Sequence, residues 1–473
     1  MPVIFDADKR FEVRVPIVIV GGGACGLIAA LAAREDGAEV IVVERDATPS
    51  GSTALSSGFI PAAYTRFQRA AGVTDSPEQM IEDIQRKNHG EADPRIVATV
   101  CRHSGPTIEW LADAHGVPIV LVEGFLYPGH SALRMHAVPE KTGAALMATL
   151  LAACGRADID LLTSARVVDI YATADRRIRG VRVLRPDGSH EEIGCDALVL
   201  ACSGFGGNAP MVREHLPEIA DALYFGHVGN QGDAVTWGRA LGAEVRDMTA
   251  YQGHGSVAVP HGILITWALM MEGGIQVNAL GKRFSDEHQG YSEQCLPVIA
   301  QPDGVAWNLY DERLHRLALE FEDYRRAQSA GAIKSAQSID ALAAALGLPG
   351  DALAQTLADV ARYATGTARD PFGRNFTGKP TLAPPYYVVK VTGALFHTQG
   401  GLAIDPDARV VDEQGIPLPN LFAGGGAACG VSGAHVWGYL SGNGLLTAVT
   451  LGRIAGRAAA KAVRENSGPV ISA

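Results

Sequence analysis

The sequence predicts an α/β protein made of one discontinuous domain and a second, inserted α+β domain. The 473 residues are too many for one ordinary hydrophobic core. A strand, a glycine-rich turn and a helix follow one another near the N-terminus. The same order returns near the C-terminus, with a segment of different character between. We therefore expect an outer domain of residues 1–250 and 398–473, and an inserted capping and catalytic domain of residues 251–397.

The N-terminal unit shows the pattern most clearly. Ile17–Val20 is a β-branched apolar strand, a helix rich in alanine and leucine runs to Arg34, and a second strand covers residues 39–43. The other elements that we expect are helices at 94–111, 142–154 and 338–363, hairpin strands within 159–200 around a turn at 186–188, strands at 387–391 and 418–423, and a last helix from about 443 to 463.

Composition and charge exclude several classes of protein. Hydrophobic residues make up 47% and charged residues 19%, and the net charge of −11 disfavours nucleic acids and anionic membranes, which bind basic faces. No signal peptide is visible in residues 1–12, and no apolar stretch approaches the ~20 residues of a membrane span. The seven cysteines show no CxxC spacing. We expect a cytoplasmic protein with no metal, membrane or nucleic-acid partner.

The turn after the first strand carries a phosphate-binding pattern. Gly21, Gly23 and Gly26 form G-x-G-x-x-G between a strand and a helix. These glycines allow a tight turn, a close approach of the backbone to a diphosphate, and close packing of helix on strand. The helix N-terminus faces the negative charge, and Glu44 after the next strand accepts hydrogen bonds from ribose hydroxyls. The unit predicts a Rossmann-like domain that binds a dinucleotide.

Two later glycine-rich segments distinguish a flavin from a nicotinamide. Residues 201–207 follow one predicted strand, and residues 420–426 follow another, ahead of Gly442-Asn443-Gly444 at the start of the last helix. A flavin needs such a late helix, because a helix N-terminus stabilises the negative charge of the reduced ring. The expected cofactor is FAD.

With these motifs in place, the sequence resembles the fumarate reductase / 3-ketosteroid dehydrogenase superfamily of flavoproteins over nearly its whole length. Residues 51–60 are similar to the segment beside the flavin, which in membrane-bound succinate dehydrogenases carries a histidine bonded to FAD. No histidine occurs in residues 47–64, so the resemblance implies non-covalent FAD. The usual acid of the late A-x-G-E segment is replaced by Gly426. The expected cofactor-binding residues are Gly21, Gly23, Ala24, Cys25, Gly26, Glu44, Arg45, Ser52, Thr53, Ser57, Gly58, Val167, Ala201, Ser203, Gly204, Gly425, Asn443, Gly444 and Leu445.

The resemblance also indicates whether the residues needed for fumarate reduction are present. Soluble fumarate reductases hold substrate carboxylates with two histidines, which match His254 and His397, and with three arginines. Here the arginine expected after the R-F-x-x-E motif at residues 283–287 is Tyr291, and the other two are Tyr439 and Met270. Without guanidinium groups a dicarboxylate loses charge-assisted, bidentate hydrogen bonds. Fumarate-type chemistry is therefore disfavoured.

The same tyrosine positions are similar to those of 3-ketosteroid dehydrogenases. In that family one tyrosine removes the proton beside the ketone, another binds the ketone oxygen together with a backbone N–H, and a third supports the base. The resemblance assigns these roles to Tyr291, to Tyr439 with the turn at 442–444, and to Tyr127. Further candidates for substrate contact are Gly442 and Tyr251.

The proposed chemistry sets two physical requirements. An enolate oxygen needs fixed donors, and losing one donor typically costs ~10²–10³ in rate. A tyrosine base near neutral pH needs its pKa lowered by about 3 units from its reference value of about 10. The β-hydrogen then leaves as hydride to flavin N5.

The function expected from these residues is an FAD-dependent dehydrogenase that introduces a C=C bond beside a ketone. The substrate would be a small cyclic ketone such as cyclohexanone or 4-oxocyclohexanecarboxylate, with an unidentified electron acceptor. A flavoprotein acting on polycarboxylates, similar to fumarate reductase or tricarballylate dehydrogenase, remains an alternative, as does a flavin-binding electron-transfer or sensor protein. The tyrosines and histidines also have structural alternatives, and a structural role is favoured for Arg134, His136 and Asp233.

Overall fold

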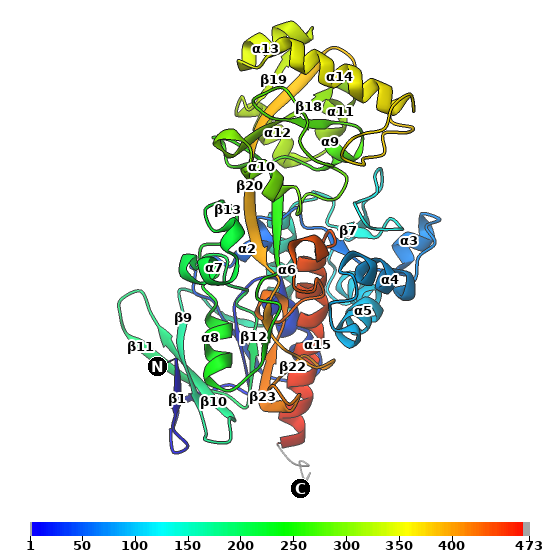
Figure 1. The fold of residues 1–473 in the computed structure, drawn as a ribbon. Coiled ribbons are helices and arrows are strands. Elements are labelled where there is room, and N and C mark those ends of the chain that lie inside the picture. Colours follow the sequence, from blue (N-terminus) through cyan, green and yellow to red (C-terminus); the bar gives the residue numbers. More distant parts are fainter. Residues whose placement is uncertain (1, 467–473) are drawn as a thin grey trace.

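A six-stranded sheet forms the centre of the larger domain in the computed structural model, which describes residues 2–466 (Figure 1). All neighbouring strands pair in parallel except β22 and β23. Every residue of β3 is buried, as expected for a parallel strand covered on both faces. Its strands, in spatial order, are β22 (Arg409–Val411), β23 (Pro417–Ala423), β12 (Ala197–Leu200), β3 (Ile17–Val20), β4 (Val40–Val43) and β8 (Asp160–Leu162).

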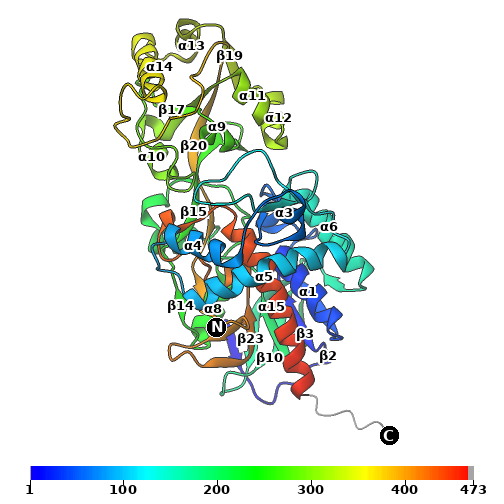
Figure 2. The same cartoon turned by 90° about the vertical axis from the view of Figure 1, so that its right-hand side faces the viewer.

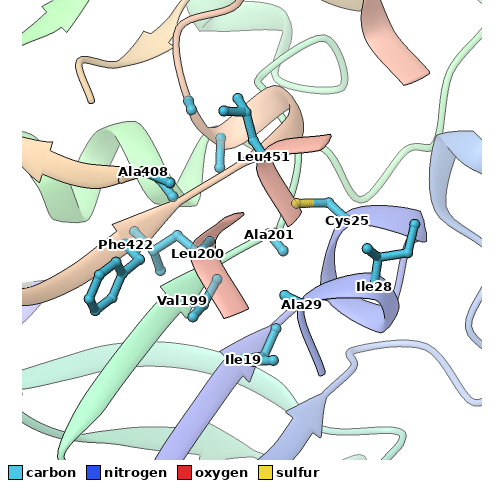
Figure 3. Packing of buried hydrophobic residues seen from close by; sticks show 14 of the residues in the cluster. Ile19, Cys25, Ile28, Ala29, Val199, Leu200, Ala201, Ala408, Phe422 and Leu451 are labelled. Carbon is cyan, nitrogen blue, oxygen red and sulfur yellow. The ribbon is translucent and has the colours of Figure 1, made fainter. Parts of the chain in front are cut away.

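The two ends of the chain meet in this domain. The C-terminal strand β23 pairs with β12, which also pairs with β3, and helix α15 (Asn443–Asn466) packs against α1 (Ala24–Glu35). A Cβ at Gly456 would lie 2.1 Å from the Ala29 carbonyl oxygen, so glycine permits the close helix contact. Figure 3 shows Cys25 and Ala29 of α1 beside Leu451 of α15, above the buried strands. The expected discontinuous α/β domain is therefore present.

A second sheet and several helices complete the larger domain. The sheet has the order β1 (Val3–Phe5), β9 (Arg166–Ala172), β10 (Ile178–Leu184), β11 (His190–Gly194), β2 (Val13–Arg14). The predicted turn at 186–188 joins antiparallel β10 and β11, whereas β8 and β12 join the parallel sheet instead of forming hairpins. The main helices are α4 (Pro77–Lys87), α5 (Pro94–Asp113), α6 (Gly143–Arg156), α7 (Ala209–His215) and α8 (Asp233–Ala240), and a small sheet contains β5 (Ile60–Pro61), β7 (Met135–Ala137) and β6 (Val120–Leu121).

The inserted domain, mostly green and yellow at the top of Figure 1 and seen from the side in Figure 2, is built on a seven-stranded sheet whose long orange strand β20 (Tyr386–Thr398) runs down to the larger domain. We propose β15 and β20 as the connections between the domains. The other strands are β15 (Tyr251–Ala258), β16 (Ile263–Leu264), β17 (Ile275–Val277), β18 (Val305–Asp311), β13 (Leu223–Tyr224) and β19 (Ile333–Ala336). The helices are α9 (Ala268–Met271), α10 (Cys295–Ile299), α11 (Glu312–Ala318), α12 (Glu322–Ser329), α13 (Ile339–Leu346) and α14 (Gly350–Ala364).

The single helix expected over residues 338–363 is in fact two helices, α13 and α14. Gly347, with φ of +69°, ends α13 in a left-handed conformation, and Pro349 precedes the first residue of α14. A left-handed glycine is a common helix terminator, and proline favours the start of a new helix over the continuation of the old one. Because the residues on both sides of the break have helical apolar periodicity, the sequence pattern predicted one continuous helix.

Residues 2–466 contain neither a membrane-spanning helix nor a cluster of metal ligands. None of their helices has the length and apolarity that a membrane crossing requires. Within the same residues, no three His, Cys, Asp or Glu side chains are grouped so that they could hold a metal ion.

Candidate active site

One cavity between the two domains is lined by most of the residues expected to bind the cofactor and by all five expected catalytic residues. The cofactor end is lined by Gly21, Gly23, Ala24, Cys25, Glu44, Arg45, Ser52, Thr53, Ser57, Val167, Ala201, Ser203, Gly425, Gly444 and Leu445. The catalytic end is lined by Tyr127, His254, Tyr291, His397 and Tyr439, and Gly442 lies with them.

Four of the expected cofactor residues do not line this cavity. A Cβ at Gly26 would lie 1.9 Å from the Gly21 carbonyl oxygen, so Gly26 serves the packing of α1 on the turn. Gly204 faces Thr398 in the same way, and Gly58, with φ of +71°, lies against the Thr142 carbonyl. Asn443 is buried behind the wall, where its amide donates to the Ser432 hydroxyl at 3.1 Å.

The cofactor end has the chemistry of a dinucleotide site. The Glu44 carboxylate accepts hydrogen bonds from the backbone N–H groups of Gly22 at 2.6 Å and Asp46 at 2.9 Å. Two carboxylate oxygens have room for further donors such as ribose hydroxyls. The N-terminus of α1 opens at Gly23, and a positive helix end suits a diphosphate. The residues present therefore fit FAD.

The sequence did not identify part of the cofactor wall. Asp233, for which a structural role was favoured, lines the cavity at the first turn of α8, and burial raises the pKa of its carboxyl. Asn230 also lines it, and its amide donates to the Ser52 hydroxyl at 2.8 Å. These residues follow no cofactor motif and reach the site only through the fold.

Two tyrosines face each other at the catalytic end. The Tyr291 and Tyr439 rings lie 6.2 Å apart in an edge-to-face arrangement, and both side chains are buried. Tyr291 comes from the loop before α10, whereas Tyr439 comes from the turn before α15. The Gly444 N–H donates to the Tyr439 hydroxyl at 3.5 Å. The pair therefore lies at the N-terminus of a long helix, where negative charge is stabilised.

The ionisation of these tyrosines differs from the sequence expectation. Burial raises the pKa of Tyr291 to about 12 and that of Tyr439 well above its ordinary value, where a downward shift was expected. The hydrogen bond between the two phenols lowers the pKa of Tyr291 and raises that of Tyr439. Ser441 and the Gly442 N–H also lower the pKa of Tyr291. Tyr291 is therefore the phenol whose phenolate has the most hydrogen-bond donors.

His254, on β15, packs between aromatic rings. Its imidazole stacks on Tyr291 at 4.7 Å and on Phe396 at 5.1 Å. The Ser256 N–H donates to its Nδ1 at 3.1 Å, which leaves the proton on Nε2. Burial lowers the pKa of His254 to about 3, so the ring is a neutral donor at neutral pH.

His397, on β20, is also neutral. Burial lowers its pKa to about 4. The Gln399 amide donates to His397 Nδ1 at 2.7 Å, and its oxygen accepts from Ser432 at 2.8 Å, which fixes the orientation of the amide. A Cβ at Gly444 would lie 2.6 Å from His397 Nε2, so glycine leaves room for the imidazole at the start of α15.

The other two predicted tyrosines differ in position. Tyr127 lines the cavity, packs on Phe125 at 4.7 Å, and has a pKa raised by burial and by the charge of Tyr291. Tyr251 is fully buried in a hydrophobic cluster with Phe205 and Leu395 and does not line the cavity, and burial together with Glu218 raises the pKa of its hydroxyl. Its strand directs the Tyr251 side chain into the core, away from the cavity in which a substrate contact was expected.

The R-F-x-x-E motif acts as a structural support for the loop that carries Tyr291. Arg283 donates to Glu287 at 2.6 Å, and Arg374 donates to the same carboxylate at 3.0 Å. Arg374 also donates to the Met270 carbonyl at 2.7 Å. These charges are buried and mutually paired, so the guanidinium groups are not available to a substrate. Arg134 is likewise buried in ion pairs with Asp75 and Asp83, as the favoured structural role implies.

The two ends of the cavity differ in charge. Arg45 and Arg166 line the cofactor end, but the catalytic end is lined by neutral polar and aromatic side chains and one acid, Asp323. Among the described lining residues, the catalytic end has no lysine or arginine. The indole of Trp267 and the hydroxyl of Thr266, neither of which the sequence singled out, also line this end.

Comparison with known proteins defines the class. Residues 16–445 match the model of the family described as FAD binding domain, and the chain belongs to that family. It is an FAD-dependent oxidoreductase.

The relatives include both kinds of enzyme that the sequence resembles. A probable fumarate reductase of Shewanella frigidimarina is 30% identical over 447 residues, covering 94% of this chain and 74% of its own. The 4-oxocyclohexanecarboxylate 2-dehydrogenase of Sinomonas cyclohexanicum is 25% identical, covering 93% and 92%.

Solved structures support the same fold. The open conformation of a flavocytochrome c3 fumarate reductase superposes with a TM-score of 0.81 at 29% identity, over 96% of this chain and 79% of that one. A 3-ketosteroid-Δ4-(5α)-dehydrogenase of Rhodococcus jostii RHA1 superposes with a TM-score of 0.75 at 24% identity, over 96% and 98%, and shows the fold alone.

Proposed function

We propose that this flavoenzyme is a dehydrogenase that introduces a C=C bond between the α and β carbons of a ketone. The observation that carries the proposal is the catalytic end itself. Two buried phenols meet there beside the backbone N–H groups of Gly442 and Gly444, and no lysine or arginine is among the described lining residues. Such donors suit one neutral carbonyl oxygen that gains negative charge during the reaction.

Each residue of the catalytic end has a proposed role in the reaction. Tyr439 and the Gly442 N–H bind the ketone oxygen and stabilise the charge that develops on it. Tyr291, as phenolate, takes the proton from the α carbon, and the pair of electrons left behind forms the new double bond. FAD, held at the other end of the cavity, supplies the two-electron acceptor for the hydride that leaves the β carbon. Burial, and then the negative charge of Tyr291, raise the pKa of Tyr127, so Tyr127 stays a neutral phenol beside the proposed base.

The same geometry argues against a polycarboxylate as substrate. Both histidines are neutral at neutral pH, since burial lowers their pKa values to about 3 and about 4. Asp323 would repel a second carboxylate, and the nearby guanidinium groups are paired with Glu287. A dicarboxylate would therefore lose its hydration without gaining a charged partner.

The walls favour a cyclic ketone. Phe59, Trp267 and Phe396 line the same cavity, where Trp267 packs on Tyr291, Phe59 on Tyr127 and Phe396 on His254, and they offer flat apolar surfaces to a ring. His254, with its proton on Nε2, offers a neutral donor to a second polar group. The name of the Sinomonas relative describes a ring that carries both a ketone and a carboxylate, which supports this class of substrate.

The flavin is proposed to be held without a covalent bond. The segment 51–60 lines the cavity through Gly51, Ser52 and Thr53, and no histidine occurs in residues 47–64. Precipitation of the holoenzyme with acid should leave the flavin in the supernatant. Flavin that stays with the protein pellet would contradict this part of the proposal.

A substrate panel tests the proposed function. The oxidised holoenzyme is mixed anaerobically with cyclohexanone, 4-oxocyclohexanecarboxylate, a 3-ketosteroid and succinate, and the oxidised flavin band is followed. At least one cyclic ketone should bleach the flavin and yield the enone, while succinate should not. Rapid reduction by succinate, or reoxidation of the reduced enzyme by fumarate with no response to any ketone, would favour the polycarboxylate alternative.

A further inference from the structure

A buried histidine, His130, contacts the turn before α15 on the side that faces away from the cavity. His130 lies in the loop between β6 and β7, is 6% exposed, and its Nε2 lies 2.9 Å from the backbone carbonyl oxygen of Ser441. The two residues are 311 positions apart in the chain. His130 does not line the cavity, so any effect on the reaction must pass through the Ser441 carbonyl.

The protonation of His130 is fixed by its other neighbour. Arg134 Nη1 lies 3.3 Å from His130 Nδ1, and a guanidinium can only donate. Nδ1 is therefore the acceptor, and the proton on Nε2 is donated to the Ser441 carbonyl. Arg134 is itself held by ion pairs with Asp75 and Asp83. Burial first, and then the charge of Arg134, lower the pKa of His130 to about 4, so the ring is neutral at neutral pH.

The hydrogen bond from His130 to the Ser441 carbonyl also determines the direction of the Gly442 N–H. The cis peptide bonds of residues 2–466 are Val259–Pro260 and Pro384–Pro385, so the bond between Ser441 and Gly442 is trans. In a trans peptide the C=O and N–H groups point in opposite directions. With the carbonyl directed at His130, the Gly442 N–H is directed toward the cavity, where it lowers the pKa of both Tyr291 and Tyr439.

Apart from His130 and the two phenols, little holds the Ser441–Gly442 peptide in this orientation. Gly442 has φ of +85°, and a Cβ there would lie 2.5 Å from Pro61, so the position requires glycine. No backbone carbonyl within residues 2–466 accepts from the Gly442 N–H. A peptide next to glycine rotates more freely than others, and rotation would turn the Ser441 carbonyl, a negative dipole, toward the substrate oxygen.

We propose that His130 is a positioning residue that holds the Ser441–Gly442 peptide so that its N–H completes the oxyanion-binding site. This inference rests on the proposed function, because it names a further determinant of the same ketone site. Arg134, Asp75 and Asp83 fix His130, His130 fixes the Ser441 carbonyl, and the carbonyl fixes the Gly442 N–H. None of these four side chains touches the substrate.

The test compares His130→Leu, which removes the donor, with His130→Gln, whose amide can replace Nε2–H. The matched control is His136→Leu, which removes a second buried histidine of the same segment that contacts Thr65 at 2.8 Å and does not line the cavity. His130→Phe, which keeps a ring, replaces the leucine variant if that one does not fold. Bound FAD and thermal unfolding report on folding in each case.

Two measurements are made on each holoenzyme. Single-turnover flavin reduction by the ketone should fall by ~10²–10³ in His130→Leu and by less than about tenfold in His130→Gln. Titration with substituted phenols, whose oxygen resembles the enolate, should show a matching loss of affinity, greatest for the most acidic phenols. His136→Leu should lower the melting temperature without changing phenol affinity.

The two proposals fail in different ways. If no ketone reduces the wild-type flavin, the proposed function is wrong, but weaker phenol binding by His130→Leu would still support the positioning of the N–H. If His130→Leu, or His130→Phe in its place, keeps wild-type phenol affinity, the inference is overturned whatever the substrate proves to be. Equal losses in the Leu, Gln and His136 variants would assign His130 a packing role only.

Discussion

The two ends of the cavity recognise their partners by different means. The cofactor end is shaped largely by backbone: Gly21 and Gly23 open the turn, and the N-terminus of α1 begins there. At the catalytic end side chains from five separate segments meet, and they bring aromatic rings and hydroxyls but no lysine or arginine among the described lining residues. The first end is defined by local spacing in the sequence, whereas the second exists only after the domains have folded together.

Tyr291→Phe should produce the largest effect, because it removes the proposed base. Single-turnover flavin reduction by a cyclic ketone should fall by ~10²–10⁴, while FAD stays bound. The measurement is stopped-flow loss of the oxidised flavin band. A variant that reduces its flavin at the wild-type rate would show that Tyr291 only packs against His254.

Tyr439→Phe should have the next largest effect. It removes one donor to the ketone oxygen, so the reduction rate should fall by ~10²–10³. It should also weaken the binding of phenols, which Tyr291→Phe should affect less. Phenol titration of both holoenzymes checks this order, and the reverse order would exchange the roles of the two tyrosines.

Glu44→Gln should affect only the cofactor end. The carboxylate accepts from Gly22 and Asp46, and charged hydrogen bonds are worth about 1.5–3 kcal/mol, so FAD affinity should fall by about tenfold to a hundredfold. At saturating FAD, flavin reduction by the ketone should stay within about twofold of wild type. FAD binding to the apoprotein and single-turnover kinetics measure the two effects. A large loss of rate at saturating FAD would show that the two ends are not separable.

Tyr251→Phe should have the smallest effect. Its hydroxyl is buried outside the cavity, on the side of Glu218, so its removal takes no hydrogen-bond donor from the catalytic end. The expected change is less than about twofold in rate and no loss of thermal stability. The variant also serves as the matched control for Tyr291→Phe. A marked loss of activity would return Tyr251 to the list of substrate contacts.

The sequence predicted the two ends to different extents, for a physical reason. Gly21, Gly23 and Glu44 lie within 24 residues of one another, and the spacing of strand, turn and helix determines where they go. The contact between His130 and Ser441 spans 311 positions and left no local pattern. Tyr251 was misplaced because strand alternation does not say which face meets the cavity.

Burial was the other quantity that the sequence did not reveal. The expectation of a lowered pKa for Tyr291 considered only nearby donors, but the buried site reverses the direction of the shift. Its consequence is that only a small fraction of Tyr291 is ionised at neutral pH. At pH values below the pKa, each rise of one pH unit increases the ionised fraction tenfold.

The pH dependence of flavin reduction therefore tests the proposed role of Tyr291 most directly. With the pKa of Tyr291 at about 12, the single-turnover rate of the wild-type enzyme should rise about tenfold per pH unit from pH ~7 to ~10. In Tyr291→Phe the rate should be low and independent of pH over the same range. An equal pH dependence in both proteins, or no pH dependence in the wild type, would contradict proton removal by the Tyr291 phenolate.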